Sequence, residues 1–296
     1  MTRLAAPPQL GRDGRLGNQL FMMSATLALA WRDGAVPAFP DDWRYRHVWE
    51  FPDGWFVARG DLVGLPQVTN HPAVAHLPER WRHYLQDVSL LDGFWPRLAS
   101  MWRASLTADA ASVLAAAEVR CFDGLPGPVL SVHVRRGDNV TNPPGTINAV
   151  DPEFYPRAVQ VARAAAPFPL RSVAVFSDDP DWCEQNRDLL GAADLPLRVF
   201  HGASRSKETD PAYLTESADE WIDLLLGAHC SAHVLSNSTF AWWSAALSSN
   251  RRPVYPSYWV GPELTGSGFD PSLLFPAGWR RVDASPLTTD TRYPAG

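Results

Sequence analysis

The sequence has few cysteines and no long hydrophobic run. Only Cys121, Cys183 and Cys230 are cysteines among 296 residues, and their wide spacing matches neither a disulfide framework nor a zinc-binding pattern. A reducing compartment fits this usage best. The longest apolar stretch, residues 20–31, is too short to span a bilayer, and residues 1–8 lack the apolar core of a signal peptide. We therefore expect a cytoplasmic protein without a membrane-spanning segment.

A large excess of charge is also missing. The chain has 26 Lys and Arg residues against 32 Asp and Glu residues, which gives a formal net charge of −6 at pH 7. This balance argues against a broad nucleic-acid-binding surface, so any cationic site must be local. The hydrophobic share of 46% and the charged share of 20% are typical of a globular protein rather than a disordered one.

Two common nucleotide-binding signatures are absent as well. A glycine-rich turn at residues 14–19 leads into a predicted helix over residues 19–31, with glycines only at Gly14 and Gly17. The turn lacks the third glycine of the dinucleotide fingerprint and the lysine of a P-loop. An NAD-dependent oxidoreductase or an NTPase is therefore disfavoured. A glycine turn before a helix still suits an anion, because the first N–H groups of a helix have no intrahelical partner.

The second half of the chain alternates short apolar runs with helical patterns. This order is typical of a doubly wound, parallel α/β sheet. The predicted strands and helices, in chain order, are 129–134, 151–165, 172–176, 180–190, 197–200, 216–229, 232–235 and 239–247.

The turn-rich segment 123–128 separates this pattern from a less regular first half. We place the domain boundary there, with an N-terminal domain over residues 1–127 and a C-terminal domain over residues 128–296. In the first domain the sequence predicts a helix over residues 19–31 and further helix between residues 93 and 117.

Polar clusters follow three of the predicted strands. Strand 129–134 ends in His133 and is followed by Arg135, Arg136, Gly137 and Asp138. The other two clusters are residues 177–179 and 236–239. Because the carboxyl ends of parallel strands lie at one edge of a sheet, these clusters are expected to form a nucleotide site together.

Each cluster has a role in such a site and a plainer alternative. Arg135 and Arg136 suit a pyrophosphate, although an Arg-Arg pair is more often a solvated surface. Asp178 or Asp179 could accept the N1–H and N2–H groups of guanine, or could simply cap the next helix. Residues 236–239 cap a helix in either case, and its first N–H groups offer a second phosphate cradle.

Taken in order, these segments resemble the alpha-1,2-fucosyltransferases of glycosyltransferase family 11. The resemblance runs from about residue 14 to residue 247, and between Val36 and Ala117 it is confined to the neighbourhood of Tyr84-Leu85-Gln86. The segments that carry it are residues 14–21, 133–138, 176–183, 223–226 and 236–243.

The resemblance implies a GT-B-like fold: two Rossmann-type domains with the active site in the cleft between them. It implies an inverting galactoside alpha-1,2-fucosyltransferase that moves L-fucose from GDP-L-fucose to the 2-hydroxyl of a terminal galactoside, without a metal or other cofactor. The expected donor-binding residues are Arg15, Gly17, Asn18, Gln19, His133, Arg135, Arg136, Asp178, Asp179, Ser236, Asn237, Ser238, Thr239 and Phe240.

Arg136 and Asp138 are the expected catalytic residues. Without a metal, the departing GDP needs fixed cations and dipoles, which the arginines and a helix N-terminus can supply. Asp138 is a candidate general base, or it only orients Arg135 or Arg136. His133 is more often structural in such a place. Two alternatives stay open for the whole chain: transfer of another GDP-sugar or to another acceptor, and a nucleotide- or glycan-binding protein without activity.

Overall fold

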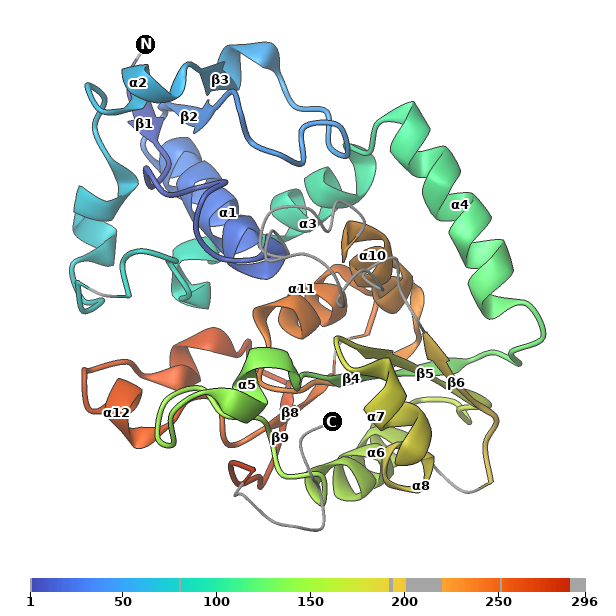
Figure 1. Ribbon diagram of the computed structural model, residues 1–296. Helices are drawn as coiled ribbons and strands as arrows, with labels where there is room; N and C mark the ends of the chain where they lie inside the picture. Colours follow the sequence, from blue (N-terminus) through green and yellow to red (C-terminus); the bar gives the residue numbers. More distant parts are fainter. Residues whose placement is uncertain (1, 80, 192–193, 201–219, 251, 288–296) are drawn as a thin grey trace. The chain divides into compact units, whose positions relative to one another are not determined.

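The computed structural model describes residues 2–79, 81–191, 194–200, 220–250 and 252–287 (Figure 1). The chain forms two compact units. Unit 1 comprises Met1–Val113 and Ser267–Phe275, and unit 2 comprises Leu114–Gly266 and Pro276–Gly296. The units divide within helix α4 (Ala108–Phe122), whereas the sequence-based boundary lies after that helix, between residues 127 and 128.

Unit 2 is built on a six-stranded sheet in which every pair of neighbours is parallel. The strand order is β6-β5-β4-β7-β8-β9, which is the 3-2-1-4-5-6 order of a Rossmann sheet. The topological switch point, from which successive strands are added in opposite directions, lies between β4 and β7. The strands are β4 (Val129–Val134), β5 (Ser172–Ser177), β6 (Leu197–Phe200), β7 (Ala232–Val234), β8 (Val254–Pro256) and β9 (Arg280–Val282).

Helices cover both faces of this sheet (Figure 1). One face carries α6, α7 and α8, and the other carries α10 and α11, as expected for a doubly wound fold. Apolar strand residues such as Val132 and Val175 are buried against α6 residues such as Phe154. The helices are α5 (Gly137–Thr141), α6 (Phe154–Ala165), α7 (Pro180–Gln185), α8 (Arg187–Leu190), α10 (Glu220–His229), α11 (Thr239–Leu247) and α12 (Pro262–Thr265).

The structure confirms the four predicted strands and most of the predicted helices of this unit. The single helix predicted over residues 180–190 is wrong, because it breaks at Asn186. The Asn186 side chain donates to the carbonyl of Trp182 at 2.8 Å and so closes the end of α7. Residues 216–219 of another predicted helix lie outside the described residues. Strands β8 (VYP) and β9 (RRV) were not predicted, since the proline of β8 and the two arginines of β9 obscure a strand pattern.

Unit 1 contains a smaller parallel sheet in the order β1-β2-β3. The sequence did not predict it, because its central strand contains Pro37 and Pro40, which normally argue against a strand. The long helix α1 packs on this sheet. The elements are β1 (Arg3–Ala5), α1 (Leu16–Arg32), β2 (Val36–Pro40), η1 (Asp53–Trp55), β3 (Phe56–Val57), α2 (Arg59–Leu62), η2 (Val68–Asn70), η3 (Pro72–Val74), η4 (Val88–Leu91), α3 (Trp95–Ala104) and η6 (Pro271–Leu274).

Helix α1 is buried on nearly all sides, and tryptophans enclose it. Trp49 and Trp102 pack edge to face with centroids 5.3 Å apart, and both indoles are fully covered. The Trp102 indole N–H donates to Ser24 of α1 at 2.8 Å, so its buried polar group is satisfied. These tryptophans form a core that fixes α1 and therefore the glycine turn at its start.

Candidate functional site at the strand ends

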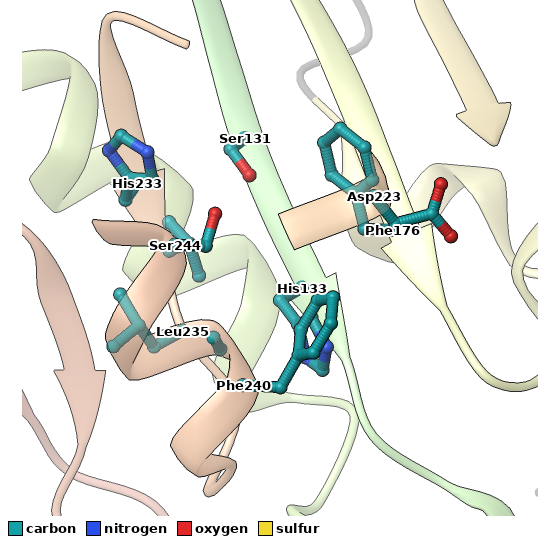
Figure 2. Close-up of a pocket in the computed structure, with 10 residues that line it drawn as sticks. Ser131, His133, Phe176, Asp223, His233, Leu235, Phe240 and Ser244 are labelled. Atoms are coloured by element: carbon teal, nitrogen blue, oxygen red, sulfur yellow. The ribbon is translucent and has the colours of Figure 1, made fainter. Parts of the chain in front are cut away.

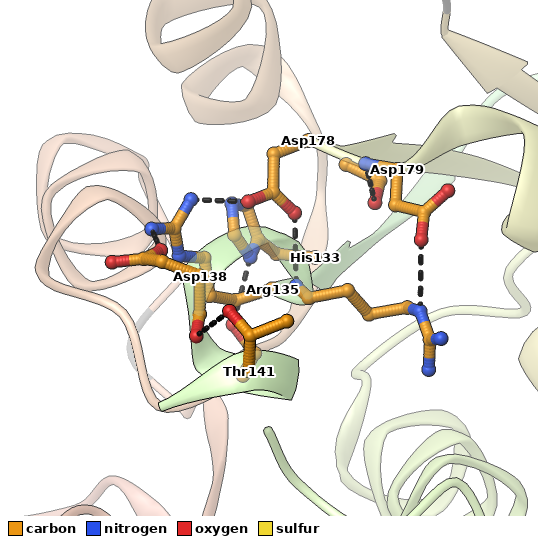
Figure 3. A network of polar contacts seen from close by, with 9 residues as sticks. His133, Arg135, Asp138, Thr141, Asp178 and Asp179 are labelled. Carbon is orange, nitrogen blue, oxygen red and sulfur yellow. Dashed lines mark hydrogen bonds and ion pairs between the residues drawn. The ribbon is translucent and has the colours of Figure 1, made fainter. Parts of the chain in front are cut away.

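Arg135 is held at the end of β4 by two carboxylates (Figure 3). Its guanidinium forms ion pairs with Asp178, which follows β5, and with Asp138 in α5. The other oxygen of Asp178 accepts the backbone N–H of Arg136 at 2.9 Å. Gly137 makes this approach possible, because a Cβ there would collide with the Asp178 carboxylate. The structure therefore confirms that the polar clusters after β4 and β5 contact each other.

Arg136 faces the other way from its neighbour. Its side chain is only 3% exposed, donates through Nε to Asp179 at 2.9 Å, and stacks on Trp182 with 4.3 Å between guanidinium and ring centroid. Its buried Nη2 has no hydrogen-bond partner among the residues that the structure describes. Asp179 also accepts the N–H of Trp182 at 3.2 Å, which confirms its interpretation as the cap of α7.

His133 joins β4 to the segment that follows β7. Its Nδ1 lies 2.8 Å from Oγ of Ser236, and its ring packs against Phe240 with centroids 5.5 Å apart. Burial lowers the pKa of His133 to about 4, and Arg135 adds to this effect while Asp178 opposes it. The imidazole is therefore neutral near pH 7. The contact between His133 and Ser236 places residues 236–239 at the same edge of the sheet as the clusters after β4 and β5.

A small cavity lies beneath this contact, between β4, β7, α10 and α11 (Figure 2). Its volume is about 10 Å³, which is the space of one water molecule and not of a nucleotide. Ser131, Asp223 and Ser244 line it together with His133 and His233. Apolar residues, among them Phe176 and Phe240, complete the lining, and the cavity is too small to hold a substrate.

The start of α11 is open rather than capped. Ser238 occupies the cap position, but within the described part of the chain its side chain makes no cap hydrogen bond, and the first turn has no acidic residue. The expected side-chain cap is therefore wrong for this helix. Asn237 turns inward and donates to the carbonyls of Asn148 at 2.8 Å and Trp259 at 3.1 Å. As at any helix start, the first backbone N–H groups of α11 have no partner within the helix, and such groups favour an anion.

The glycine turn of unit 1 likewise leads into a helix without a side-chain cap in the part of the chain that the structure describes. Helix α1 begins after Arg15, which over the described residues forms no side-chain cap, and its first turn also lacks an acidic residue. The side chain of Gln19 donates to the carbonyl of Gly14 at 2.9 Å and accepts the indole N–H of Trp43 at 2.9 Å. Gln19 therefore shapes the turn from within, while the buried Gly17 and half-buried Asn18 lie in the helix's first turn.

A further segment of unit 1 joins this turn. Gln86 donates from its side chain to Oδ1 of Asn18 at 2.9 Å, and a Cβ on Gly14 would lie only 3.0 Å from the ring of Tyr84. The faint resemblance near residues 84–86 was the only sequence signal for this contact. Helical periodicity could not reveal it, because Gln86 and Asn18 are 68 positions apart.

No group of three or more His, Cys, Asp and Glu side chains among the described residues is placed to hold a metal ion. No helix within the described part of the chain is both long enough and apolar enough to cross a membrane.

The Rossmann-order sheet, with cationic and backbone donors at the carboxyl ends of its strands, defines an α/β protein of the nucleotide-binding class. Residues 74–255 match the model of the family described as Glycosyl transferase family 11. The match covers more than half of the sequence, and the chain belongs to this family.

Several curated proteins are similar over part of their length. The Alpha-1,2-colitosyltransferase of Escherichia coli is 27% identical over 169 residues, which are 56% of this chain and 49% of that protein. The Galactoside alpha-(1,2)-fucosyltransferase 1 of Homo sapiens is 26% identical over 188 residues, or 62% of this chain and 47% of the human protein. The chain thus spans about half the length of the curated relatives that it matches.

Among solved structures, the fucosyltransferase NodZ from Bradyrhizobium is similar at 15% sequence identity with a TM-score of 0.49. The similarity covers 83% of this chain and 93% of that chain. A structure of NodZ alpha-1,6-fucosyltransferase co-crystallized with GDP is 16% identical with a TM-score of 0.46, covering 84% and 93% of the two chains.

Proposed function

We propose that the protein is an inverting, metal-independent alpha-1,2-fucosyltransferase that uses GDP-L-fucose and a galactoside acceptor. Arg135 carries the proposal: it is a guanidinium fixed by two carboxylates at the carboxyl end of β4, where this type of sheet binds its ligands. The family match and the similarity to relatives named as alpha-1,2-fucosyl- and colitosyltransferases support the choice of reaction.

In this proposal Arg135 and the open start of α11 bind the diphosphate. The guanidinium provides forked N–H donors, and the helix contributes backbone N–H groups and its positive dipole end. Ser238, Thr239 and Phe240 lie at this end and are partly exposed. The neutral His133 adds no charge of its own and supports the segment after β7 through Ser236. Arg15 and Asn18 of the glycine turn stay predicted donor-binding residues.

Arg136 has a supporting role here rather than direct contact with phosphate. Its side chain is only 3% exposed, against 12% for Arg135, and it lies between Asp179 and the face of Trp182. It therefore anchors the start of α7 beneath the end of β4. Asp178 accepts from Arg135 and from the backbone of Arg136, so its carboxylate holds the turn together. A bidentate contact of Asp178 or Asp179 with guanine remains a prediction.

The proposed reaction is a single displacement. The 2-hydroxyl oxygen of galactose forms a bond to fucose C1 while the bond from C1 to the phosphate oxygen breaks. GDP leaves with the electron pair, and the hydroxyl proton passes to a base or to solvent. Asp138 is 61% exposed and bound to Arg135. We favour an orienting role for Asp138, and turnover of Asp138→Asn decides between this role and that of general base.

The experiment is a GDP-release assay with GDP-fucose and lactose in the presence of EDTA, with UDP-galactose and GDP-mannose as control donors. Release that requires lactose and is selective for GDP-fucose supports the proposal, and methylation analysis of the product identifies the linkage. Loss of release in EDTA that added metal restores would contradict metal independence. GDP binding without transfer to any galactoside would favour a non-catalytic binding protein.

A second candidate donor is a GDP-linked colitose, because an E. coli colitosyltransferase is among the similar proteins. The residues at the strand ends described above would bind the GDP portion of either donor equally well. A competition assay with both GDP-sugars separates the two, since a colitosyltransferase gives the higher kcat/KM with the colitosyl donor.

A further inference from the structure

Unit 1 has a cavity of its own beside the start of β1. Its volume is about 490 Å³, within the range of about 300–1,000 Å³ that is usual for small-molecule sites. It lies between the start of β1, the turn from α1 to β2 and the segment of residues 63–72, and we call it the unit 1 groove. All of its lining residues belong to unit 1, so this unit forms the groove without any residue of unit 2.

An open stretch of backbone borders the groove at Arg3. The N–H of Val36 donates to the carbonyl of Thr2 at 2.9 Å, so Thr2 directs its backbone groups toward β2. Successive residues of a strand direct these groups to alternate sides, so the N–H and C=O of Arg3 point away from β2. On that side Pro66 accepts the N–H of Ala5 at 2.8 Å, and within the described chain no backbone hydrogen bond reaches Arg3 there. Arg3 therefore offers one donor and one acceptor at an open sheet edge.

Asp33 is held in a fixed orientation in the wall of the groove. Nδ1 of His71 accepts the backbone N–H of Ala73 at 3.0 Å, so the neutral ring carries its proton on Nε2. Nε2 lies 2.9 Å from Oδ2 of Asp33 and donates to it. The Asp33 side chain is 47% exposed, so its carboxylate can also accept from a ligand. Asp33 therefore presents a charged acceptor whose direction His71 sets.

The lining of the groove carries no net charge. Asp33 and Arg3 are its formally charged side chains, and the Arg3 guanidinium donates to the carbonyl of Gly54 at 2.6 Å. Thr2 and Asn70 are exposed and have neutral polar side chains, each able to donate and to accept. This balance favours a neutral ligand with many hydroxyl groups, because each hydroxyl also donates and accepts.

Two buried atoms of the lining residues lack a hydrogen-bond partner among the described residues, namely Nε of Arg3 and Oε1 of Gln67. The NH₂ group of Gln67 is engaged, because it donates to the carbonyls of Leu62 and Leu65. Native proteins satisfy most buried polar atoms with protein groups or ordered water. An unpaired donor and an unpaired acceptor in one lining therefore indicate a place for a bound polar group.

We propose that the unit 1 groove is a carbohydrate-binding site that takes a neutral sugar unit. The polar groups would bind its hydroxyls, and Val63, which is 77% exposed, and Leu65 would pack on its C–H groups. The inference goes beyond the proposed function, because no step of fucose transfer uses these residues. For an enzyme that acts on glycans, such a site would raise the local concentration of glycan.

The test is an NMR titration of the full chain with labelled valine methyl groups and methyl β-galactoside as the probe. Val63 is the reporter, because it lines the groove. We expect its methyl signals to shift and to reach saturation. At pH 6, galacturonate carries a negative charge and galactosamine a positive charge on the same kind of ring. Neither should bind more tightly than the neutral sugar, because the lining has no net charge.

Substitutions separate binding in the groove from binding elsewhere. Asn70→Trp places a large side chain at an exposed position of the groove and should abolish the Val63 shift. Ala75→Trp is the matched control, because Ala75 is exposed in the same unit but does not line the groove. Asp33→Asn keeps an oxygen for His71 but replaces the charged acceptor by a neutral amide, so the affinity should fall about tenfold.

Absence of a saturable Val63 shift in the wild type overturns the inference, as does an equal shift in Asn70→Trp. Tighter binding of either charged sugar would also overturn it. If Asn70→Trp fails to fold in thermal melting, Thr2→Trp fills the groove from β1 instead. The Val63 signal does not depend on transfer. Intact Val63 shifts without GDP release from GDP-fucose would therefore reject the proposed function alone, and the converse would reject this inference alone.

Discussion

Within the described part of the chain, helices α1 and α11 both begin without a side-chain cap, but the residues around the two helix starts differ. Each helix begins, among the described residues, without a side-chain cap and without an acidic residue in its first turn. The surroundings of the start of α1 in unit 1 include the neutral amide of Gln19 and the indole of Trp43, beside Arg15 at the N-cap position. Those of α11 in unit 2 include the ion pairs of Arg135. By contrast, the N-terminus of α7 is closed by Asp179.

Under the proposed function, this difference predicts how each helix start responds to salt and to substitution. Neutral hydrogen bonds depend on geometry and are insensitive to salt, whereas ion pairs near the surface weaken as ionic strength rises. The ion-paired region around Arg135 should therefore contribute most to the stabilisation of departing GDP, and the glycine turn at residues 14–19 should depend mainly on its geometry. The following substitutions test this difference.

The largest effect is expected at Arg135. Arg135→Ala should lower kcat about 100- to 1000-fold, the usual cost of removing one group that stabilises developing negative charge. Arg163→Ala is the control, since Arg163 forms an exposed ion pair with Asp194 in the same unit. Turnover of Arg135→Ala within tenfold of wild type, in a steady-state GDP-release assay, would show that the charged region does not perform this role.

Arg136→Ala should lower the stability of the protein more than its turnover, in contrast to Arg135→Ala. It removes the ion pair with Asp179 and the contact with Trp182, and we expect a loss of roughly 2–3 kcal/mol in unfolding free energy. This is slightly below the range for a fully buried pair, because Asp179 is partly exposed. Urea denaturation measures it. If stability is unchanged but turnover is abolished, Arg136 is a catalytic residue, as the sequence suggested.

Acid should destabilise unit 2 through its buried histidines. Burial lowers the pKa of both His133 and His233 to about 4. Below pH 6.5 the unfolded chain binds protons that the folded state excludes, so stability falls as pH drops from about 6.5 toward 4. The slope is about 1.4 kcal/mol per pH unit for each histidine.

Urea denaturation across this pH range, compared with the same series for His233→Gln, measures the effect. The variant should show a shallower slope because it removes one of the two groups. An unchanged slope would mean that His233 does not contribute to the acid sensitivity.

The smallest effect is expected at the glycine turn of residues 14–19. Gly14→Ala places a Cβ 2.8 Å from that of Asn18 at a φ of +74°, so it should cost roughly 1–3 kcal/mol in stability and weaken GDP binding. Gly34→Ala is the control, because its φ of +64° is similar while nothing lies within 4 Å of the added atom. Equal GDP affinity in the two variants would contradict a role for the turn in binding.

Sequence reasoning recovered the regular part of this molecule well. β4 and β6 have the predicted bounds because turn residues flank short runs that are rich in Val, Leu and Phe. β2 was missed, since its prolines obscure the pattern. The clustering of Arg135 with Asp178 followed from the rule that parallel strands end together.

Other features of the site depend on tertiary packing. Adjacent arginines look alike in a sequence, and only the position of Trp182 shows that Arg136 turns inward. In the same way, Asn237 was expected to face the ligand but serves instead to tie loops together. Contacts between distant segments, such as that of Gln86 with Asn18, leave no periodic trace in the sequence.

The return of Ser267–Phe275 to unit 1 limits how members of this family can be recombined. Phe269 stacks on Trp81 with centroids 4.0 Å apart, so one part of unit 1 follows residues 114–266 of unit 2 in the sequence. A chimera made by a single crossover near residue 113 would join the first unit of one family member to a foreign packing segment. Exchange of unit 1 therefore requires a second, linked replacement of the nine residues from Ser267 to Phe275.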